Sequence, residues 1–231
     1  MKIALLLCGQ ARFFKDGYKS IKEKIIDKYN PDIFIHTWKY KNNYAYSAPW
    51  NNLGKIKIDL DDINEYIELY KPNKYMIENS LEKIPLTKDY IKTSSKYTKY
   101  NFYSYLYSLN KCYNLIENKL DYNIYIIIRS DVIIYNFPEP NLNYIQIWNR
   151  FPDREEVIDT MIVNIPYKFM DIYIDLINNL DIYYEKGYSF NYEEMTHAHF
   201  KENNLYDNTM KLNETLFKWG IFRNNNTIEN L

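Results

Sequence analysis

A charged triplet, Arg129-Ser130-Asp131, separates two runs of apolar β-branched residues and is the segment best suited to chemistry. Burying charged side chains beside apolar strands costs free energy unless the charges are paired with each other or bind a ligand. One interpretation is structural, an ion pair between Arg129 and Asp131 at a strand end. The other is a site for a divalent cation and a diphosphate. One carboxylate with substrate phosphates can hold a hard cation, and an arginine pairs with phosphate oxygens.

A second polar segment, Gly9-Gln10-Ala11-Arg12, follows the first apolar run of the chain. Glycine lets the backbone approach a ligand closely, although a single glycine can equally turn the chain. Arg12 adds a cation, and it is one of only five arginines in the chain. Ligands of open α/β sheets bind beyond the carboxyl ends of the strands, so both polar segments are candidates for one binding crevice.

Acidic residues and histidines later in the chain supply candidate acid–base groups. Asp159 ends an acidic stretch that precedes an apolar run, where it is either a solvated loop residue or a base. Glu194 and His197 are three residues apart and can share one face of a helix. His197 and His199 are two apart and cannot face one point, so at most one of them is a ligand or a catalytic group. A solvated Glu–His helix is the structural alternative.

Apolar patterns predict the elements that must position these residues. Residues 3–8 form a strand pattern buried on both faces, 16–28 a helix, and 33–38 a second strand in which His36 is expected to be structural. This order indicates a right-handed βαβ unit with parallel strands. The other expected elements are helices at 59–70, 102–120, 166–180 and 192–203, and strands at 74–77, 144–148, 160–165 and on both sides of the triplet within 123–135. Together they predict one α/β domain.

Composition narrows the class of protein. The chain has 231 residues, 29 basic against 30 acidic, so electrostatic capture of nucleic acid is not expected. Cys8 and Cys112 lack the spacing of a disulfide framework or a metal site, which favours a reducing, cytoplasmic environment. No stretch approaches the ~20 apolar residues of a membrane span, and the first apolar run does not match a signal peptide. The sequence has no Walker, GxGxxG or GxSxG motif, which argues against P-loop enzymes, dinucleotide enzymes and α/β-hydrolases.

Four short motifs occur in an order that resembles a known family. They are LLCGQARF at 6–13, DIFIHTW at 32–38, YSLNKC at 107–112 and IIRSD at 127–131. Together they resemble the GT-A-type glycosyltransferases of large DNA viruses and bacterial surface-polysaccharide clusters, and are similar to the chlorella-virus rhamnosyltransferase domain and WavE-type transferases. The resemblance implies a single GT-A-like (Rossmann-like) domain, with a mixed, mostly parallel sheet flanked by helices. Nucleotide binding is expected in about 1–135 and acceptor binding in about 136–231.

The resemblance also implies a reaction and roles for individual residues. The implied reaction moves a hexosyl or deoxyhexosyl group from a nucleotide sugar, expected to be UDP-linked, to a glycan or glycoconjugate acceptor, with Mn²⁺ or Mg²⁺. Asp131 corresponds to the metal-binding end of a DxD motif, in which Arg129 replaces the first Asp and adds a cation. The other implied roles are nucleotide contacts from Gly9, Gln10, Arg12, Tyr107, Lys111 and Arg129, a metal contact from His199, and a base at Asp159 or Glu194, with Asp159 preferred.

Two other functions stay open. A sugar nucleotidyltransferase shares the sheet and the metal, but it should carry a Gly-rich, basic first loop. The segment at 9–12 has only one glycine, Gly9, and one arginine, Arg12, which is poor support for this function. A non-catalytic carbohydrate-binding protein would use Arg129 and Asp131 as a structural ion pair. The variant Asp131→Asn separates these cases, because an enzyme should lose activity at nearly constant stability. A structural pair should instead lose about 3–5 kcal/mol of stability.

Overall fold

The computed structural model describes residues 1–40, 44–46, 55–57, 60–81, 83, 96–149, 158, 162–223 and 227–229. The α-helices are α1 (Phe14–Ile21), α2 (Asp27–Tyr29), α3 (Leu60–Tyr70), α4 (Lys96–Asn114), α5 (Tyr167–Ile174), α6 (Leu180–Glu185) and α7 (Tyr192–Glu202). The strands are β1 (Ile3–Gly9), β2 (Asp32–Lys39), β3 (Tyr44–Tyr46), β4 (Lys55–Lys57), β5 (Lys74–Asn79), β6 (Ile124–Ile128), β7 (Val132–Asn136), β8 (Ile145–Trp148), β9 (Ile162–Pro166), β10 (Thr209–Leu212), β11 (Lys218–Arg223) and β12 (Thr227–Glu229).

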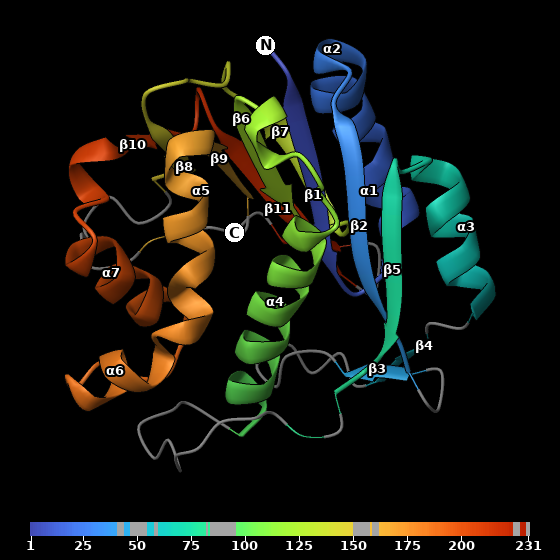
Figure 1. Ribbon diagram of the computed structural model, residues 1–231. Coiled ribbons are helices and arrows are strands. Elements are labelled where there is room, and N and C mark those ends of the chain that lie inside the picture. Colours follow the sequence, from blue (N-terminus) through green and yellow to red (C-terminus); the bar gives the residue numbers. More distant parts are fainter. Residues whose placement is uncertain are drawn as a thin grey trace.

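A seven-stranded sheet in the order β10-β8-β9-β6-β1-β2-β5 forms the centre of the fold (Figure 1). The strands β6, β1, β2 and β5 are mutually parallel, which confirms the predicted βαβ unit at the start of the chain. Only β9 runs against its neighbours, β6 and β8, while β10 is parallel to β8. The sheet is therefore mixed and mostly parallel, with helices on both sides.

The apolar side chains of β1 alternate between two cores, as expected for a strand covered on both faces. Leu5 and Leu7 belong to the core that contains residues of α1 and α3 and of the small sheet β12-β11-β7. Leu6 and Cys8 belong to the opposite core, with residues of α4, α5 and α7. In Figure 1, α4 crosses the front of the sheet, while α1 lies behind β2 and α3 lies beyond β5.

The chain changes sheets at the charged triplet. Strand β6 ends at Ile128 in the large sheet, and β7 begins at Val132 in the small one, where it pairs antiparallel with β11. Residues 129–131 are therefore the connection between two sheets, at the carboxyl end of a fully buried strand. Hydrophobic periodicity predicted two strands here but gave no indication that they belong to different sheets.

Several boundaries differ from the sequence-based expectations. Helix α4 begins at Lys96, six residues before the expected start, and ends at Asn114 instead of 120, because bonds such as Leu115 N–H to the Cys112 carbonyl tighten its end. The helix expected over 166–180 is divided into α5, a 3₁₀ turn and α6. Strands β10, β11 and β12 were not predicted, because the polar, Asn-rich sequence after Leu205 hides the short apolar stretches.

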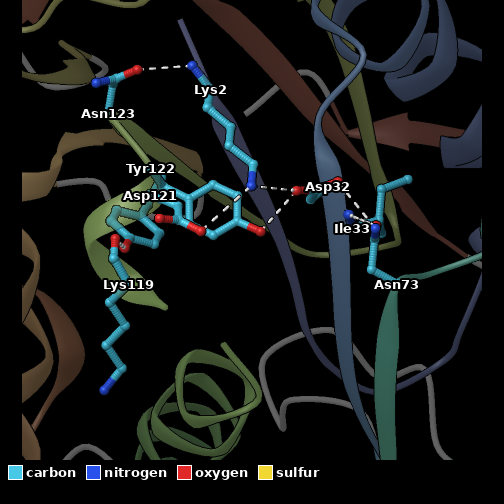
Figure 2. A network of polar contacts seen from close by, with 9 residues as sticks. Lys2, Asp32, Ile33, Asn73, Lys119, Asp121, Tyr122 and Asn123 are labelled. Atoms are coloured by element: carbon cyan, nitrogen blue, oxygen red, sulfur yellow. Dashed lines mark hydrogen bonds and ion pairs between the residues drawn. The ribbon is translucent and has the colours of Figure 1, made fainter. Parts of the chain in front are cut away.

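Polar residues at the amino ends of the strands bind one another (Figure 2). The backbone N–H of Lys2 donates to Asn123 Oδ1 at 2.8 Å, and its Nζ lies 3.5 Å from Asp32 Oδ2. The hydroxyl of Tyr122 donates to the same Asp32 oxygen at 2.8 Å, and Asn73 Nδ2 donates to Oδ1 at 3.0 Å. This network joins the starts of β1, β2, β5 and β6. Its charged groups therefore hold neighbouring strands together.

No helix within the described ranges is both long and apolar enough to cross a membrane.

Candidate functional site

The two polar segments singled out in the sequence lie side by side at the carboxyl edge of the large sheet. Strands β1 and β6 are adjacent and parallel, with Leu7 opposite Ile128. The chain leaves β1 at Gly9, whose φ of 107° is a conformation that favours glycine, and leaves β6 at Arg129. The shared strand register thus brings the turn at residues 9–13 against the triplet at 129–131, as open α/β sheets arrange their binding crevices.

Asp131 is bound by two arginines. Its Oδ2 accepts a hydrogen bond from Arg12 Nε at 2.7 Å and another from Arg129 Nη2 at 2.5 Å, and its Oδ1 accepts one from Arg129 Nε at 3.0 Å. Burial of Asp131 by itself would raise the pKa of its carboxyl, but the two guanidinium groups outweigh burial and lower that pKa below its ordinary value. The carboxylate is therefore ionised, and the three side chains together carry one excess positive charge.

Backbone and side-chain contacts fix the position of this Arg12–Asp131–Arg129 cluster. The hydroxyl of Ser130 donates to the carbonyl of Gln10 at 3.1 Å, which ties the triplet to the first turn. Helix α1 packs directly on the same connection: a methyl group on Gly17 would lie 2.2 Å from the Ser130 carbonyl oxygen. Ser20, one turn later, accepts the backbone N–H of Ile134 at 3.0 Å. These contacts anchor the backbone next to Arg129 and tie it to the turn that carries Arg12.

The predicted metal ligands do not fit a divalent cation. Asp131 is 1% exposed, and its oxygens accept three hydrogen bonds from two cations. These bonds occupy three of the about four acceptor positions of a carboxylate. The second predicted ligand, His199, is buried, with Nε2 2.6 Å from the Ile172 carbonyl and Nδ1 2.8 Å from the Tyr183 hydroxyl. Both of its ring nitrogens are thus used within the fold. Among the described residues, no group of three or more His, Cys, Asp or Glu side chains could hold a metal ion.

A chain of hydrogen bonds connects the first turn to α4 and β5. The N–H of Gly9 donates to Ser108 Oγ at 2.8 Å, and Ser108 Oγ lies 2.8 Å from Nδ1 of the buried His36. His36 Nε2 lies 2.9 Å from Glu78 Oε2, and Glu78 Oε1 lies 3.8 Å from Lys111 Nζ. The expected structural role of His36 fits this position. Ser108 and Glu78 were missed, because no local pattern marks a pair that only the sheet brings together.

Tyr107 and Lys111, the two predicted nucleotide contacts on α4, lie beside this chain. Lys111 Nζ is 5.2 Å from the centre of the Tyr107 ring, within reach of a cation–π interaction. The ring of Tyr107 stacks on Trp38, with centroids 5.5 Å apart. Helix α4 therefore presents an aromatic ring and a cation on the side where β2 ends, next to the turn that carries Gly9.

Glu194, one of the two predicted bases, caps a helix. Its Oε2 accepts the backbone N–H of Ser189 at 3.0 Å, and its Oε1 accepts Asn191 Nδ2 at 3.0 Å. Asn191 Oδ1 in turn accepts the N–H of Glu194 at 2.8 Å, which completes a reciprocal cap at the start of α7. His197, on the same helix, contacts the hydroxyl of Tyr206. The preferred base, Asp159, lies outside the described residues.

The two buried histidines predict a loss of stability in mild acid. Burial lowers the pKa of His36 and of His199; Glu78 opposes this shift at His36, and the Ile172 carbonyl and Asp175 oppose it at His199. Between the lowered pKa and the unfolded value of about 6.5, the unfolded chain binds more protons, so stability falls as the pH falls. We expect a constant melting temperature above about pH 7 and a decrease below about pH 6.5.

Circular dichroism melts from about pH 8 to pH 5 would check this expectation. Asp131 does not contribute in this window, because its lowered pKa places its titration below the ordinary aspartate value of 3.8. A melting temperature that is unchanged or higher at the acidic end would contradict the neutral, buried state of the two rings.

Comparison with solved structures identifies the fold. Core-mannan synthase A from Aspergillus fumigatus, in an Mn/GDP form, superposes with a TM-score of 0.55 at 9% identity, covering 95% of this chain and 74% of that one. The galactosyltransferase LgtC, in complex with donor and acceptor sugar analogues, gives a TM-score of 0.50 at 11% identity, covering 93% and 74%. A glycosyltransferase involved in glycosylation of the major capsid of PBCV-1 gives 0.44 at 10% identity, covering 93% and 83%.

Sequence comparison adds nothing to this likeness. No protein-family model matches the chain, and no curated protein matches it significantly. At such low identities the superpositions establish architecture and leave the activity to be argued from the site. The mixed, mostly parallel sheet with helices on both faces and the two superpositions agree, and the chain has the fold of the GT-A glycosyltransferases.

Proposed function

We propose that the chain is a glycosyltransferase that moves a hexosyl or deoxyhexosyl group from a nucleotide sugar, UDP-linked by preference, to a glycan or glycoconjugate acceptor. The observation that carries the proposal is the Arg12–Asp131–Arg129 cluster at the carboxyl edge of the sheet. This edge is where open α/β folds bind ligands, and arginine binds phosphate oxygens through two parallel hydrogen bonds. The fold shared with solved glycosyltransferases agrees with this reading.

The reaction breaks the bond between the sugar's anomeric carbon and the diphosphate oxygen and forms a bond to an acceptor hydroxyl oxygen. Negative charge develops on the leaving diphosphate, and fixed positive groups stabilise it in the transition state. Arg12 and Arg129 supply such groups at a fixed position. No step is assigned to Mn²⁺ or Mg²⁺, because Asp131 and His199 do not fit a divalent cation.

The remaining parts of the site follow from the same placement. Gly9 and Gln10 would contact the nucleotide from the first turn, and Tyr107 and Lys111 from α4. Nucleotide binding by about residues 1–135 and acceptor binding by about 136–231 are therefore part of the proposal. An inverting reaction also needs a base for the acceptor hydroxyl. Because the Glu194 carboxylate caps α7, Asp159 is the base that we propose.

Donor binding and hydrolysis test the proposal. We expect calorimetry against UDP-, GDP- and dTDP-sugars to give a Kd below about 1 mM for at least one donor, which corresponds to about −4 kcal/mol. The same donor should be hydrolysed slowly in the absence of an acceptor. The removal of an exposed charge on α5, in Lys168→Ala, serves as the control and should leave binding unchanged. If the whole panel neither binds nor is hydrolysed, the proposal is wrong.

A further inference from the structure

We propose that His36 is a positioning residue of the donor site: as a neutral ring protonated on Nε2, it holds the turn at residues 9–13 in place through Ser108. The inference rests on the proposed function, because this turn carries three of the proposed donor contacts. It makes the shape of the donor site depend on the protonation of one buried side chain.

A side chain from α4 holds the end of β1. The N–H of Gly9, the last residue of this strand, donates to Ser108 Oγ at 2.8 Å. Ser108 is fully buried, and Gly9 has the φ of 107° at which the chain turns out of the sheet. The position of the Ser108 hydroxyl therefore sets where the turn begins.

The contacts of the His36 ring decide where each proton of this chain lies. His36 Nε2 is 2.9 Å from Glu78 Oε2, and a carboxylate only accepts hydrogen bonds, so the ring proton is on Nε2. Nδ1 is then an acceptor for the Ser108 hydroxyl, 2.8 Å away, whose oxygen in turn accepts the N–H of Gly9. Trp38 packs edge-on against the ring, with centroids 4.8 Å apart. The hydrogen bonds all point the same way, which strengthens each of them.

A second proton on the ring would reverse part of this chain. An imidazolium donates from both nitrogens, so Nδ1 would donate to Ser108 Oγ, and the hydroxyl proton would turn to the His36 carbonyl, 3.3 Å away. Ser108 Oγ would then accept two N–H groups while its own proton goes to a more distant acceptor, which weakens its bond to Gly9. Both arrangements satisfy the hydroxyl, and one proton interconverts them.

The surroundings of the ring keep it neutral near pH 7. Burial lowers the pKa of His36; Glu78 opposes this shift, and Lys111 adds to it. The titratable groups packed around this part of β2 are Glu78 on β5, Tyr107, Lys111 and Cys112 on α4, and Cys8 on β1. Burial raises the pKa of the Cys8 thiol, which is therefore neutral. The second arrangement is reached only as the pH falls below about 6.5.

An NMR titration tests this link without any ligand. Cys8-Gly9 is the one Cys-Gly pair in the sequence, so labelling cysteine with ¹³C at the carbonyl and glycine with ¹⁵N selects the Gly9 amide. We expect its signal to move between about pH 7 and pH 5 with the midpoint of the histidine signal that His36→Asn removes. A Gly9 signal that stays constant down to the pH of unfolding, or a neutral His36 with its proton on Nδ1, would overturn the inference.

Two variants divide the chain at the ring. His36→Asn places an amide near the position of Nδ1 and keeps a partner for Ser108, whereas His36→Gln places one near Nε2 and keeps a partner for Glu78. In calorimetry with whichever of UDP, GDP and dTDP the unaltered protein binds, His36→Gln should weaken binding by about tenfold and His36→Asn by about threefold or less. Equal weakening would show that the ring only fills space, and would overturn the inference. If the variants do not fold, the Gly9 titration decides.

The other fully enclosed histidine supplies the matched control. His199 is also buried and bound at both ring nitrogens, but its partners are Tyr183 and the Ile172 carbonyl, outside the chain that reaches Gly9. His199→Gln should lower the melting temperature and leave nucleotide affinity within about twofold. An equal loss of affinity there would assign the effect to stability and overturn the inference. If the unaltered protein binds none of the three nucleotides, the proposed function is wrong; binding with a constant Gly9 signal overturns the inference alone.

Discussion

Replacing Asp131 by Asn is expected to destabilise the protein by about 3–5 kcal/mol. Because the buried contacts of Asp131 predict this loss for an enzyme as well, the variant does not separate an enzyme from a non-catalytic protein by its stability, as the sequence alone suggested. The amide cannot neutralise Arg12 and Arg129, and two cations would then face each other without the carboxylate that separates them. Nucleotide binding should fall with the loss of the ordered pair. Urea unfolding followed by circular dichroism measures the stability, and calorimetry measures the binding.

A surface ion pair supplies the matched control for this variant. Asp27→Asn removes the partner of Lys22 in a pair whose side chains are about half exposed, and should change the stability little. The double variant Asp131→Asn with Arg129→Gln removes one charge of each sign from the cluster and should recover part of the lost stability. If Asp131→Asn keeps its stability and loses only nucleotide binding, Asp131 contacts the ligand directly and its orienting role is disproved.

Gly17→Ala is expected to destabilise the protein, although an alanine in a helix normally stabilises it by up to about 1 kcal/mol. The added methyl group would lie 2.2 Å from the Ser130 carbonyl oxygen and 2.8 Å from that of Val132, both of them backbone atoms. Helix α1 must therefore move away from the connection between β6 and β7. We expect a loss of about 1–3 kcal/mol and weaker nucleotide binding, because the triplet moves with its backbone.

Lys19→Ala, on the exposed side of the same helix, provides the comparison for Gly17→Ala. It also introduces an alanine into α1, but at an exposed position and with only a small change in helix propensity, so the stability should be nearly unchanged. Equal or higher stability of Gly17→Ala in urea unfolding would show that α1 does not pack on the triplet as closely as described.

The start of the fold could be predicted because its signals are local. Strand β1, the following helix and strand β2 are separate apolar patterns divided by polar turns, and chain chirality then fixes a parallel pair. That the two polar segments lie together could also be predicted, since they follow β1 and β6 at the same edge of the sheet. Their expected roles were less certain, because the role of Asp131 depends on which groups surround it.

The contacts that decide the site join residues far apart in the sequence. Arg12 and Asp131 are 119 positions apart, and Ser108 meets Gly9 across 99. No spacing rule links such pairs, and only the strand order places them together. His199 shows the same limit: the family resemblance implied a metal ligand, whereas the packing of α5 and α6 against α7 supplies hydrogen-bond partners for both ring nitrogens.

The pairing of β7 with β11 has a consequence for how the chain is made. Strand β7 ends at Asn136, and β11 begins at Lys218, about 80 residues later, which a ribosome adds in roughly 4–16 s. Until then Val132 and Ile134 lack Trp219 and Ile221, their neighbours in the same core. The nascent chain thus lacks the partner strand of β7 until β11 has been made, so the small sheet can form only late in synthesis.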